Sequence, residues 1–253
     1  MPIRPCPAVS ESPARPSGAG WLLPRRDAVI VMTDEREREI RLDNGTSASR
    51  RTYRLRPGHS LLIASADRPT RIAGNGLQLR ALPNDVSRLL AFHDHGRGIN
   101  RDIPPDRSLH ATLRVVADLG DDAVVHHWLI KQLLVDAPAF RELAALLARR
   151  EAYQLVRFVL DHPGHGVQQL ADRYGLSVAQ FRRIGRKAFG RSIKEQLRLL
   201  RAGRVLHCYA DTGRSFTRLS SDFGFSSPSH FCSEIKSLLG SAPRAIFQSV
   251  QQS

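Results

Sequence analysis

Short apolar runs separated by turn-forming residues occupy the chain from Ala28 to about Leu82. The runs are AVIVM, TYRL, SLLIAS and LQLRAL, and turn residues lie between them at 43–45, 57–58 and 74–76. Such runs, bounded by Gly, Pro, Asn and Asp, are typical of β-strands. The pattern therefore predicts a small antiparallel sandwich or barrel.

Helical spacing replaces this pattern after the last of these runs. Apolar residues recur first at Val86, Leu89 and Leu90, and a stronger periodic block covers 121–162. The intervening stretch 96–108 is typical of a loop. We therefore expect an α+β chain, in which an N-terminal β-rich region precedes an all-α C-terminal domain.

The segment 167–188 has the pattern of a helix-turn-helix motif. Gly175 suits the turn because glycine tolerates a positive φ, and Ser177 with Gln180 forms a capping-box pattern before the second helix. The apolar faces consist of Val167, Leu170, Ala171 and Tyr174 in the first helix and Phe181, Ile184, Gly185 and Ala188 in the second. The outward face of the second helix carries Gln180, Arg182, Arg183, Arg186 and Lys187. A cationic helix of this width fits the DNA major groove, although a solvated surface helix would show the same pattern.

The segment 216–239 repeats this pattern, and a pair of such motifs is more specific than one. Gly224 suits the turn, Ser227 the N-cap, and Pro228 the first helical position, where no N–H is needed. The outward residues are Ser229, His230, Ser233 and Lys236. Between the motifs, the pattern of residues 194–207 predicts one linker helix that begins with Lys194. This helix would fix the separation of the two recognition helices, which would then meet major-groove segments roughly 34 Å apart.

The distribution of charge agrees with a polyanionic partner. The chain of 253 residues has 38 Lys and Arg against 24 Asp and Glu, a net charge of +14. Residues 150–253 alone hold 16 of the basic residues and 7 of the acidic ones. Nucleic acid or an anionic membrane surface would satisfy such an excess, and charge alone does not choose between them.

About 100 residues, from roughly Tyr153 to Phe247, resemble the DNA-binding domain of AraC/XylS-type transcriptional regulators. The matching features are Leu170-Ala171, Gly224-Phe225, Phe231, Lys236, Gly240 and Pro243. The runs SSPSHF, EIK and FRR are similar to the InvF-like activators of invasion-type type III secretion systems. Three positions depart from the family pattern: Ile235 replaces Phe, Phe247 replaces Arg, and Gly203 replaces Ala in the linker helix, where glycine costs about 1 kcal/mol.

The resemblance implies an activator of effector and chaperone genes that binds promoter DNA, works with RNA polymerase, and takes a type III secretion chaperone as coactivator. The family's base-reading positions fall on Ala179, Arg182, Arg183, Ser229, His230 and Ser233. The stretch 53–72 is similar to a cupin-type jelly roll of the kind that senses sugars in some relatives. An alternative function is therefore a small-molecule-responsive regulator that binds its ligand in the N-terminal sandwich, and a homodimer stays possible.

We expect four regions along the chain. These are a disordered leader at 1–20, a β-rich, degenerate cupin or jelly-roll regulatory domain at 21–110, a helical connector at 111–150, and the DNA-binding domain at 151–250. No apolar stretch approaches the roughly 20 residues that cross a bilayer, and the first residues lack the apolar core of a secretory signal. We therefore expect a cytoplasmic protein without membrane contact.

No residue pattern indicates catalysis, a cofactor or a metal. The histidines of His93-Asp94-His95 and His126-His127 point in different directions on a helix and lack further ligands at metal spacing, and a cupin enzyme would need more than His59. Cys6, Cys208 and Cys232 are far apart and form no Cys-x-x-Cys pair. We therefore expect neither a metal site, a cofactor, a disulfide framework nor an enzyme.

Overall fold

A computed structural model of the chain describes residues 20–45, 50–101, 110–115, 117–243 and 245. The predicted leader at 1–20 lies outside these residues except for Gly20, and Cys6 and Phe247 lie outside them too. The chain divides into two compact units. One holds the described residues up to Leu160 together with Lys187–Gly190, and the other holds Asp161–Arg186 and the described residues from Arg191 onward.

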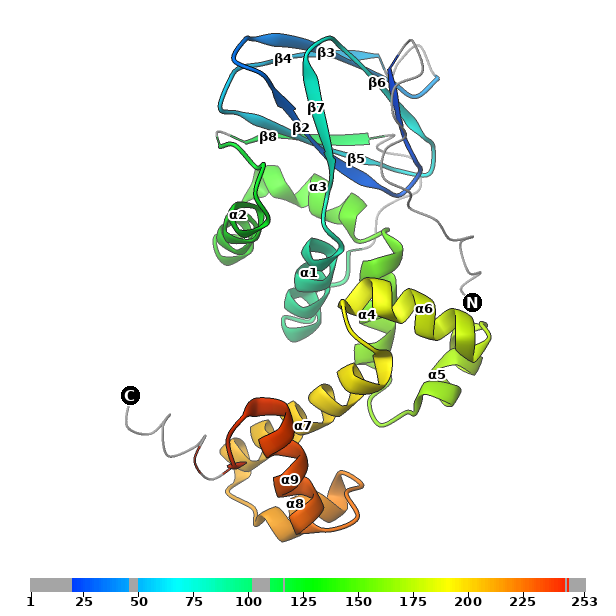
Figure 1. The fold of residues 1–253 in the computed structure, drawn as a ribbon, viewed down its shortest axis with the longest axis vertical. Helices are drawn as coiled ribbons and strands as arrows, with labels where there is room; N and C mark the ends of the chain where they lie inside the picture. The colour runs from blue at the N-terminus through cyan, green and yellow to red at the C-terminus, as the bar shows by residue number, and fades with distance from the viewer. Residues whose placement is uncertain (1–19, 46–49, 102–109, 116, 244, 246–253) are drawn as a thin grey trace. The chain divides into compact units, whose positions relative to one another are not determined.

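Two four-stranded antiparallel sheets form the β-part of the first unit among the described residues (Figure 1). One sheet has the order β1 (Trp21–Leu23), β6 (Thr70–Ala73), β3 (Arg38–Asp43) and β4 (Arg51–Leu55). The other has the order β7 (Leu77–Ala81), β2 (Ala28–Thr33), β5 (Ser60–Ser65) and β8 (His110–Val115). The expected antiparallel sandwich is thus confirmed.

The last strand lies where the sequence predicts a helical connector. β8 pairs with β5 in a register that places Leu113 opposite Leu62 and Val115 opposite Ser60. This pairing extends the second sheet by one strand, so the connector begins after residue 115. β8 is stabilised by pairing with β5, which lies some fifty positions earlier in the chain. A pattern of neighbouring residues cannot indicate such a distant partner.

Apolar side chains fill the space between the two sheets. The buried cluster takes five residues from each sheet: Leu23, Ile40, Leu42, Leu55 and Ile72 from one, and Val29, Val31, Leu61, Ile63 and Leu77 from the other. None of them is more than 8% exposed. Alternate residues on each strand point inward, as expected when two pleated sheets pack face to face.

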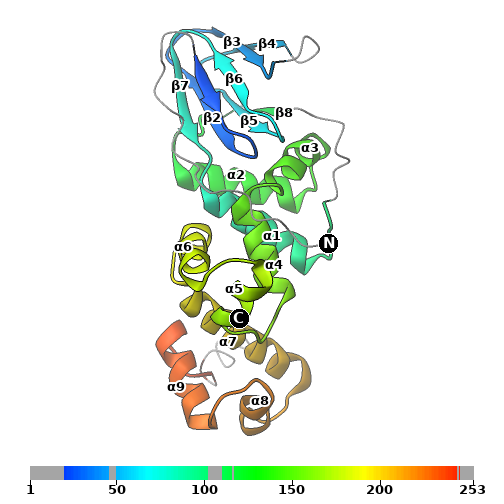
Figure 2. The ribbon, with the colours of Figure 1, turned by 90° about the vertical axis from the view of Figure 1, so that its right-hand side faces the viewer.

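Helices cover the outer face of the second sheet, and all six residues of β5 are therefore buried (Figure 2). The helices of this unit are α1 (Asn84–Gly96), α2 (Asp122–Leu134), α3 (Pro138–Leu147) and α4 (Glu151–Asp161). Among them, α3 contacts β5 and β8 directly. Trp128 of α2 packs edge-on against Phe140 of α3, with ring centroids 5.7 Å apart.

Buried polar contacts fix the start of α4 within the first unit. The Arg150 guanidinium donates to Asp27 Oδ1 at 3.2 Å, to Ser87 Oγ at 3.1 Å and to the Leu82 carbonyl at 3.0 Å. One turn later, the Tyr153 hydroxyl donates to Asp94 Oδ2 at 3.0 Å. The division between the two units falls at the end of α4, between Leu160 and Asp161.

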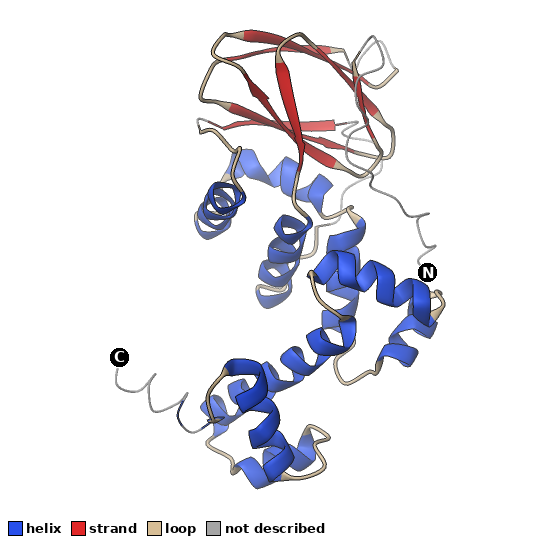
Figure 3. Ribbon diagram, viewed as in Figure 1, coloured by secondary structure: helices blue, strands red, loops and turns tan. Residues whose placement is uncertain are grey.

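The described residues after α4 form helices joined by loops, with no strand among them (Figure 3). The helices are α5 (Val167–Tyr174), α6 (Val178–Phe189), α7 (Ile193–Thr212), α8 (Phe216–Asp222) and α9 (Pro228–Leu239), and all but the end of α6 belong to the second unit. The helix-turn-helix pairs α5–α6 and α8–α9 are joined by α7, which confirms the expected all-α domain with a linker helix. α7 extends beyond the predicted 207 to Thr212, where Gly213 adopts a positive φ of 61° and ends it.

Candidate nucleic-acid interface

The first motif is held by contacts between neighbouring residues. Gly175 has a φ of 77°, and the Leu176 N–H closes α5 by donating to the Ala171 carbonyl at 3.1 Å. The Ser177 N–H donates to Gln180 Oε1 at 3.2 Å, and the Gln180 N–H donates to Ser177 Oγ at 3.3 Å. The predicted capping box is confirmed, and it sets the point at which α6 begins.

The predicted apolar faces of the two helices are largely buried. Their buried members include Leu170, Ala171 and Tyr174 on α5 and Phe181, Ile184 and Ala188 on α6. The rings of Tyr174 and Phe181 lie 5.8 Å apart. Gly185 gives α7 room, because a Cβ added there would stand 3.2 Å from Ile193 Cβ. Packing on this side leaves the opposite side of α6 in solvent.

All six residues predicted on α6 to contact DNA are exposed: Ala179, Gln180, Arg182, Arg183, Arg186 and Lys187. At 100° per residue they cover an arc of roughly 160° around the helix. The three arginines form no hydrogen bond or ion pair with any described residue, whereas Gln180 uses its carbonyl oxygen in the cap. Lys194 is also exposed, in the first turn of α7 rather than on a recognition helix.

The second motif has a similar turn and a serine N-cap. Gly224 has a φ of 72°, and the Phe225 N–H donates to the Ser220 carbonyl at 2.8 Å. Ser227 caps α9 by accepting from the His230 N–H at 3.0 Å, and Pro228 occupies the first helical position. These features agree with the sequence prediction.

An aromatic core joins α8 and α9 to the linker helix. Tyr209 of α7 stacks on Phe216 at 4.2 Å, and Phe216 and Phe225 lie 5.5 and 5.1 Å from Phe231. Ile235, which replaces the family's usual Phe, is completely buried here. Further buried members are Ala202, Val205 and Leu219. The linker helix is therefore part of the core of the second motif.

The outward residues of α9 are exposed but not equivalent. Ser229, Ser233 and Lys236 face solvent, and so does His230. The His230 ring, however, is engaged at both nitrogens, since Nδ1 lies 3.0 Å from Ser226 Oγ and Nε2 lies 3.4 Å from Glu234 Oε2. Sequence reasoning names His230 as a base-reading residue and misses these contacts. The only local signal of these contacts is that Ser226 and Glu234 each lie four positions from His230 in the sequence.

The histidines considered as metal ligands have polar neighbours within the first unit. His93 Nδ1 lies 3.1 Å from Asp94 Oδ1, and His126 Nε2 lies 2.8 Å from Asp85 Oδ2. Asp94 also accepts two hydrogen bonds from Arg101, at 2.5 and 2.8 Å. Within the part of the chain that the structure describes, no three His, Cys, Asp or Glu side chains gather as a metal site would require. No helix of that part is long and apolar enough to cross a membrane.

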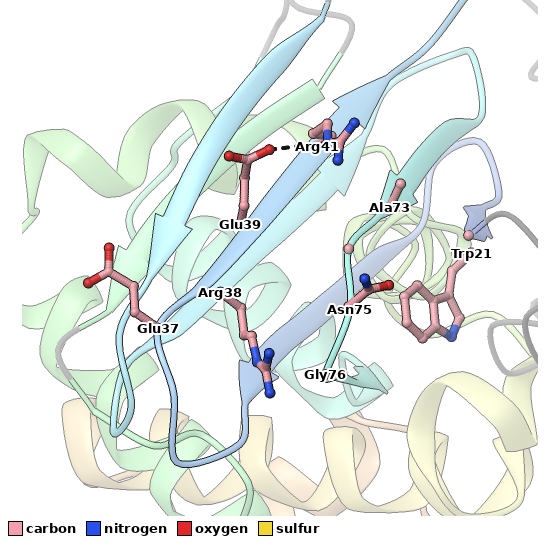
Figure 4. A pocket seen from close by; sticks show the side chains of 10 residues that line it. Trp21, Glu37, Arg38, Glu39, Arg41, Ala73, Asn75 and Gly76 are labelled. Atoms are coloured by element: carbon pink, nitrogen blue, oxygen red, sulfur yellow. Dashed lines mark ion pairs between the residues drawn. The ribbon is translucent and has the colours of Figure 1, made fainter.

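An open cavity of about 810 Å³ is lined by residues of β1 and β3 and by the end of β6 with the turn that follows it (Figure 4). Its lining includes Trp21, Arg38, Arg41 and Asn75. The two arginines are paired, Arg38 with Asp34 and Arg41 with Glu39 at 3.2 Å. Asp34 hydrogen bonding keeps the pKa of Arg38 above its usual value.

Comparisons with known proteins agree with this architecture. A family profile described as a helix-turn-helix domain matches residues 170–249. The chain is 34% identical over 170 residues to the invasion protein InvF of Salmonella typhi, a match that covers 66% of this chain and 78% of that protein. The chain belongs to the AraC/XylS family of transcriptional regulators. It is thus a DNA-binding regulator with promoter DNA as its partner, and not an enzyme.

Two further similarities were found for this AraC/XylS regulator. It is 33% identical over 106 residues to the transcriptional regulator MxiE of Shigella flexneri, which covers 40% of this chain and 50% of MxiE. The solved structure of unsaturated fatty acid bound ToxT from Vibrio cholerae aligns with 93% of this chain and 90% of ToxT, at 10% identity and a TM-score of 0.36.

Proposed function

We propose that this regulator binds promoter DNA sequence-specifically and activates the genes for type III secretion effectors and their chaperones. The observation that supports DNA reading is the row of exposed arginines on α6, which have no partner among the described residues. A guanidinium that the protein leaves unpaired keeps its hydrogen-bond donors for guanine edges or phosphates. The likeness to a protein named as an invasion protein supports the choice of target genes.

The contacts divide into base reading and charge neutralisation. Arg182 and Arg183 make bidentate contacts with guanine, and Ala179 offers an apolar contact to a thymine methyl group. Arg186, Lys187 and Lys194 neutralise backbone phosphates. On α9, the hydroxyls of Ser229 and Ser233 face base edges and Lys236 faces a phosphate.

The length of α7 supports simultaneous binding of both motifs. Its 20 residues span about 30 Å at 1.5 Å per residue, close to one turn of B-DNA. Two recognition helices joined by this rod can therefore reach consecutive major-groove segments on one side of the duplex.

Replacement of Arg183 by alanine tests the base-reading role. Duplexes selected from a random pool by the unmodified chain supply the preferred sequence, and a scrambled duplex supplies the reference. We expect Arg183→Ala to lose about 1–3 kcal/mol on the preferred duplex and to relax selectivity at one base pair. Arg51→Ala is the matched control, because Arg51 is an exposed arginine of the β-sandwich. An unchanged preference in Arg183→Ala would remove this residue from the base-reading set.

The coactivator is, in this proposal, a type III secretion chaperone that acts through the first unit, and the output is recruitment of RNA polymerase. Because the chromosome is the target, the place of action is the bacterial cytoplasm. Pull-down of the full chain with a purified chaperone, followed by transcription in vitro from a selected promoter, tests this step. Failure of the chaperone to bind or to raise transcription would contradict it, whatever the result for Arg183.

A second copy of the chain is the proposed occupant of the outer face of α2. This face exposes four apolar side chains, Val124, Ile130, Leu134 and Val135, of which Leu134 is 80% exposed. α2 has Asp121 as its N-cap, Asp122 as its first residue and Lys131 in its last turn. Antiparallel packing of two copies therefore brings each acidic start beside the other copy's lysine, in an isologous interface.

Sedimentation of variants tests this dimer. Leu134→Glu should shift the chain toward monomer, because a carboxylate would be buried against an apolar surface. Leu22→Glu is the control, since Leu22 is also an exposed leucine, 54% accessible, but lies on β1. A chain that sediments as a monomer before any change, or a Leu134→Glu variant that still dimerises, would contradict the proposed interface.

A small-molecule sensor is the second candidate function, and the cavity at Trp21 and Arg38 favours it (Figure 4). Its charged lining suits a polar effector, whereas the side chains that pack between the two sheets are apolar. Thermal shift of the full chain against polar metabolites, with Trp21→Ala as the variant, separates this function from chaperone coactivation. A stabilising metabolite whose effect Trp21→Ala abolishes would favour the sensor.

A further inference from the structure

The second recognition helix carries a buried carboxylate. Glu234 on α9 is only 7% exposed. Its Oε1 accepts a hydrogen bond at 3.1 Å from Nε of Arg198 on the linker helix α7, and its Oε2 lies 3.4 Å from Nε2 of His230. A carboxylate removed from water is costly unless charged or hydrogen-bonding groups surround it. Both contacts are therefore needed to keep Glu234 in place.

His230 connects this carboxylate to the turn of the motif. Its Nδ1 lies 3.0 Å from Ser226 Oγ, and its ring packs edge-on against Phe225 with centroids 5.9 Å apart. Together these contacts form a side-chain network of four residues: Ser226, His230, Glu234 and Arg198. The network connects the turn and the recognition helix α9 to the linker helix α7.

The acceptor character of Glu234 decides where the ring hydrogen of His230 lies. A carboxylate can only accept, so the hydrogen of the neutral imidazole belongs on Nε2. Nδ1 then has a free lone pair and accepts from the Ser226 hydroxyl, which can donate. Both ring nitrogens then have partners within the protein.

We propose that Glu234 is a positioning residue for DNA recognition. It holds His230 with its hydrogen on Nε2 and anchors α9 to α7 through Arg198, and in this way it determines which group the second motif presents to a base pair. The inference rests on the proposed DNA binding, but its first test needs no DNA.

Nitrogen NMR of the full chain labelled with ¹⁵N-histidine measures the position of the ring hydrogen directly, with the His230 signals assigned from a His230→Asn variant. In the unmodified chain we expect the hydrogen on Nε2. In Glu234→Gln, the amide oxygen still accepts from Arg198 while the amide N–H faces His230, so the ring hydrogen should move to Nδ1. A hydrogen on Nδ1 before the change, or no change of position in Glu234→Gln, would overturn the proposal.

Base selection is the second test. Glu234→Gln should change the preference at base pairs of the second half-site by roughly fivefold or more and leave the first half-site unchanged. Glu195→Gln is the matched control, because Glu195 is an exposed glutamate of α7 whose carboxylate lies 3.8 Å from Arg191. If the unmodified chain selects a sequence and Glu234→Gln selects the same one, the positioning role fails.

The two tests separate the proposals. If no duplex is preferred by the unmodified chain, the proposed function fails, and the NMR result still decides the contact between Glu234 and His230. If Glu234→Gln does not fold, the NMR spectrum of the unmodified chain can by itself contradict the predicted tautomer of His230. Ser226→Ala then provides a second variant, in which the hydrogen should stay on Nε2.

Discussion

Replacement of Arg150 by methionine removes a buried guanidinium that connects α4 to the β-sandwich. Arg150 is 5% exposed and donates to Asp27, Ser87 and the Leu82 carbonyl. Burial lowers the pKa of Arg150, and the nearby Asp27 opposes that shift. Methionine keeps much of the side-chain volume but removes all five hydrogen bonds that the guanidinium donates, and it leaves the buried Asp27 carboxylate without its cation. Breaking a buried pair in this way costs about 3–5 kcal/mol, a large part of the roughly 5–15 kcal/mol that stabilises a domain.

Urea unfolding followed by tryptophan fluorescence measures this loss in the right part of the molecule. The chain has two tryptophans, Trp21 and Trp128, and both belong to the first unit. We expect the midpoint to fall by roughly 1–3 M urea. Arg141→Met is the control, because Arg141 is 60% exposed and its pairing with Asp136 contributes little. A loss below about 1 kcal/mol in Arg150→Met would refute the anchoring of α4.

Three further predictions concern pH, the linker helix and salt. Burial, reinforced by Asp94, raises the pKa of Tyr153 from 10.0 to about 12. The folded chain therefore keeps a proton that the unfolded chain loses, so stability should fall between pH 10 and 12 by about 1.4 kcal/mol per pH unit, and Tyr153→Phe should lack this part of the slope. Gly203→Ala should stabilise the chain by about 0.5–1 kcal/mol in thermal unfolding, because a Cβ added there meets nothing within 4 Å. Gly213→Ala should destabilise it, because Gly213 has a φ of 61°, which alanine adopts only with strain. Lys194→Ala should reduce the slope of log binding constant against log salt by about 1 and leave base preference unchanged.

Features that depend on neighbouring residues could be predicted from the sequence. The capping box of the first motif, the serine N-cap of the second, the turn glycines and the apolar faces involve residues three or four positions apart. Helical periodicity and capping patterns report such spacings. The exposure of Arg182 and Arg183 follows from the same periodicity, because Phe181 and Ile184 are buried on the other side. This local information is enough to identify the recognition helices.

Features that depend on distant residues could not be predicted in this way. Arg198 and Glu234 are 36 positions apart, and nothing in their local sequence indicates that they meet. The same holds for Arg150 and Asp27, which join segments 123 positions apart and place α4 in the first unit. His230 matches a base-reading position in the family and its nitrogens contact two near neighbours, Ser226 and Glu234, but the contact that ties Glu234 to α7 comes from the distant Arg198.

Because α7 is one continuous helix, an insertion or deletion in it rotates the second motif relative to the first as well as changing the distance between them. One added residue would turn the second motif by about 100° around the axis of α7 and displace it by about 1.5 Å. A displacement so small leaves the distance between half-sites almost unchanged, but the rotation would carry one recognition helix off the shared side of the duplex. Changes of three or four residues restore the rotation approximately, and they should be the first lengths of α7 to recover binding to an operator with altered half-site spacing.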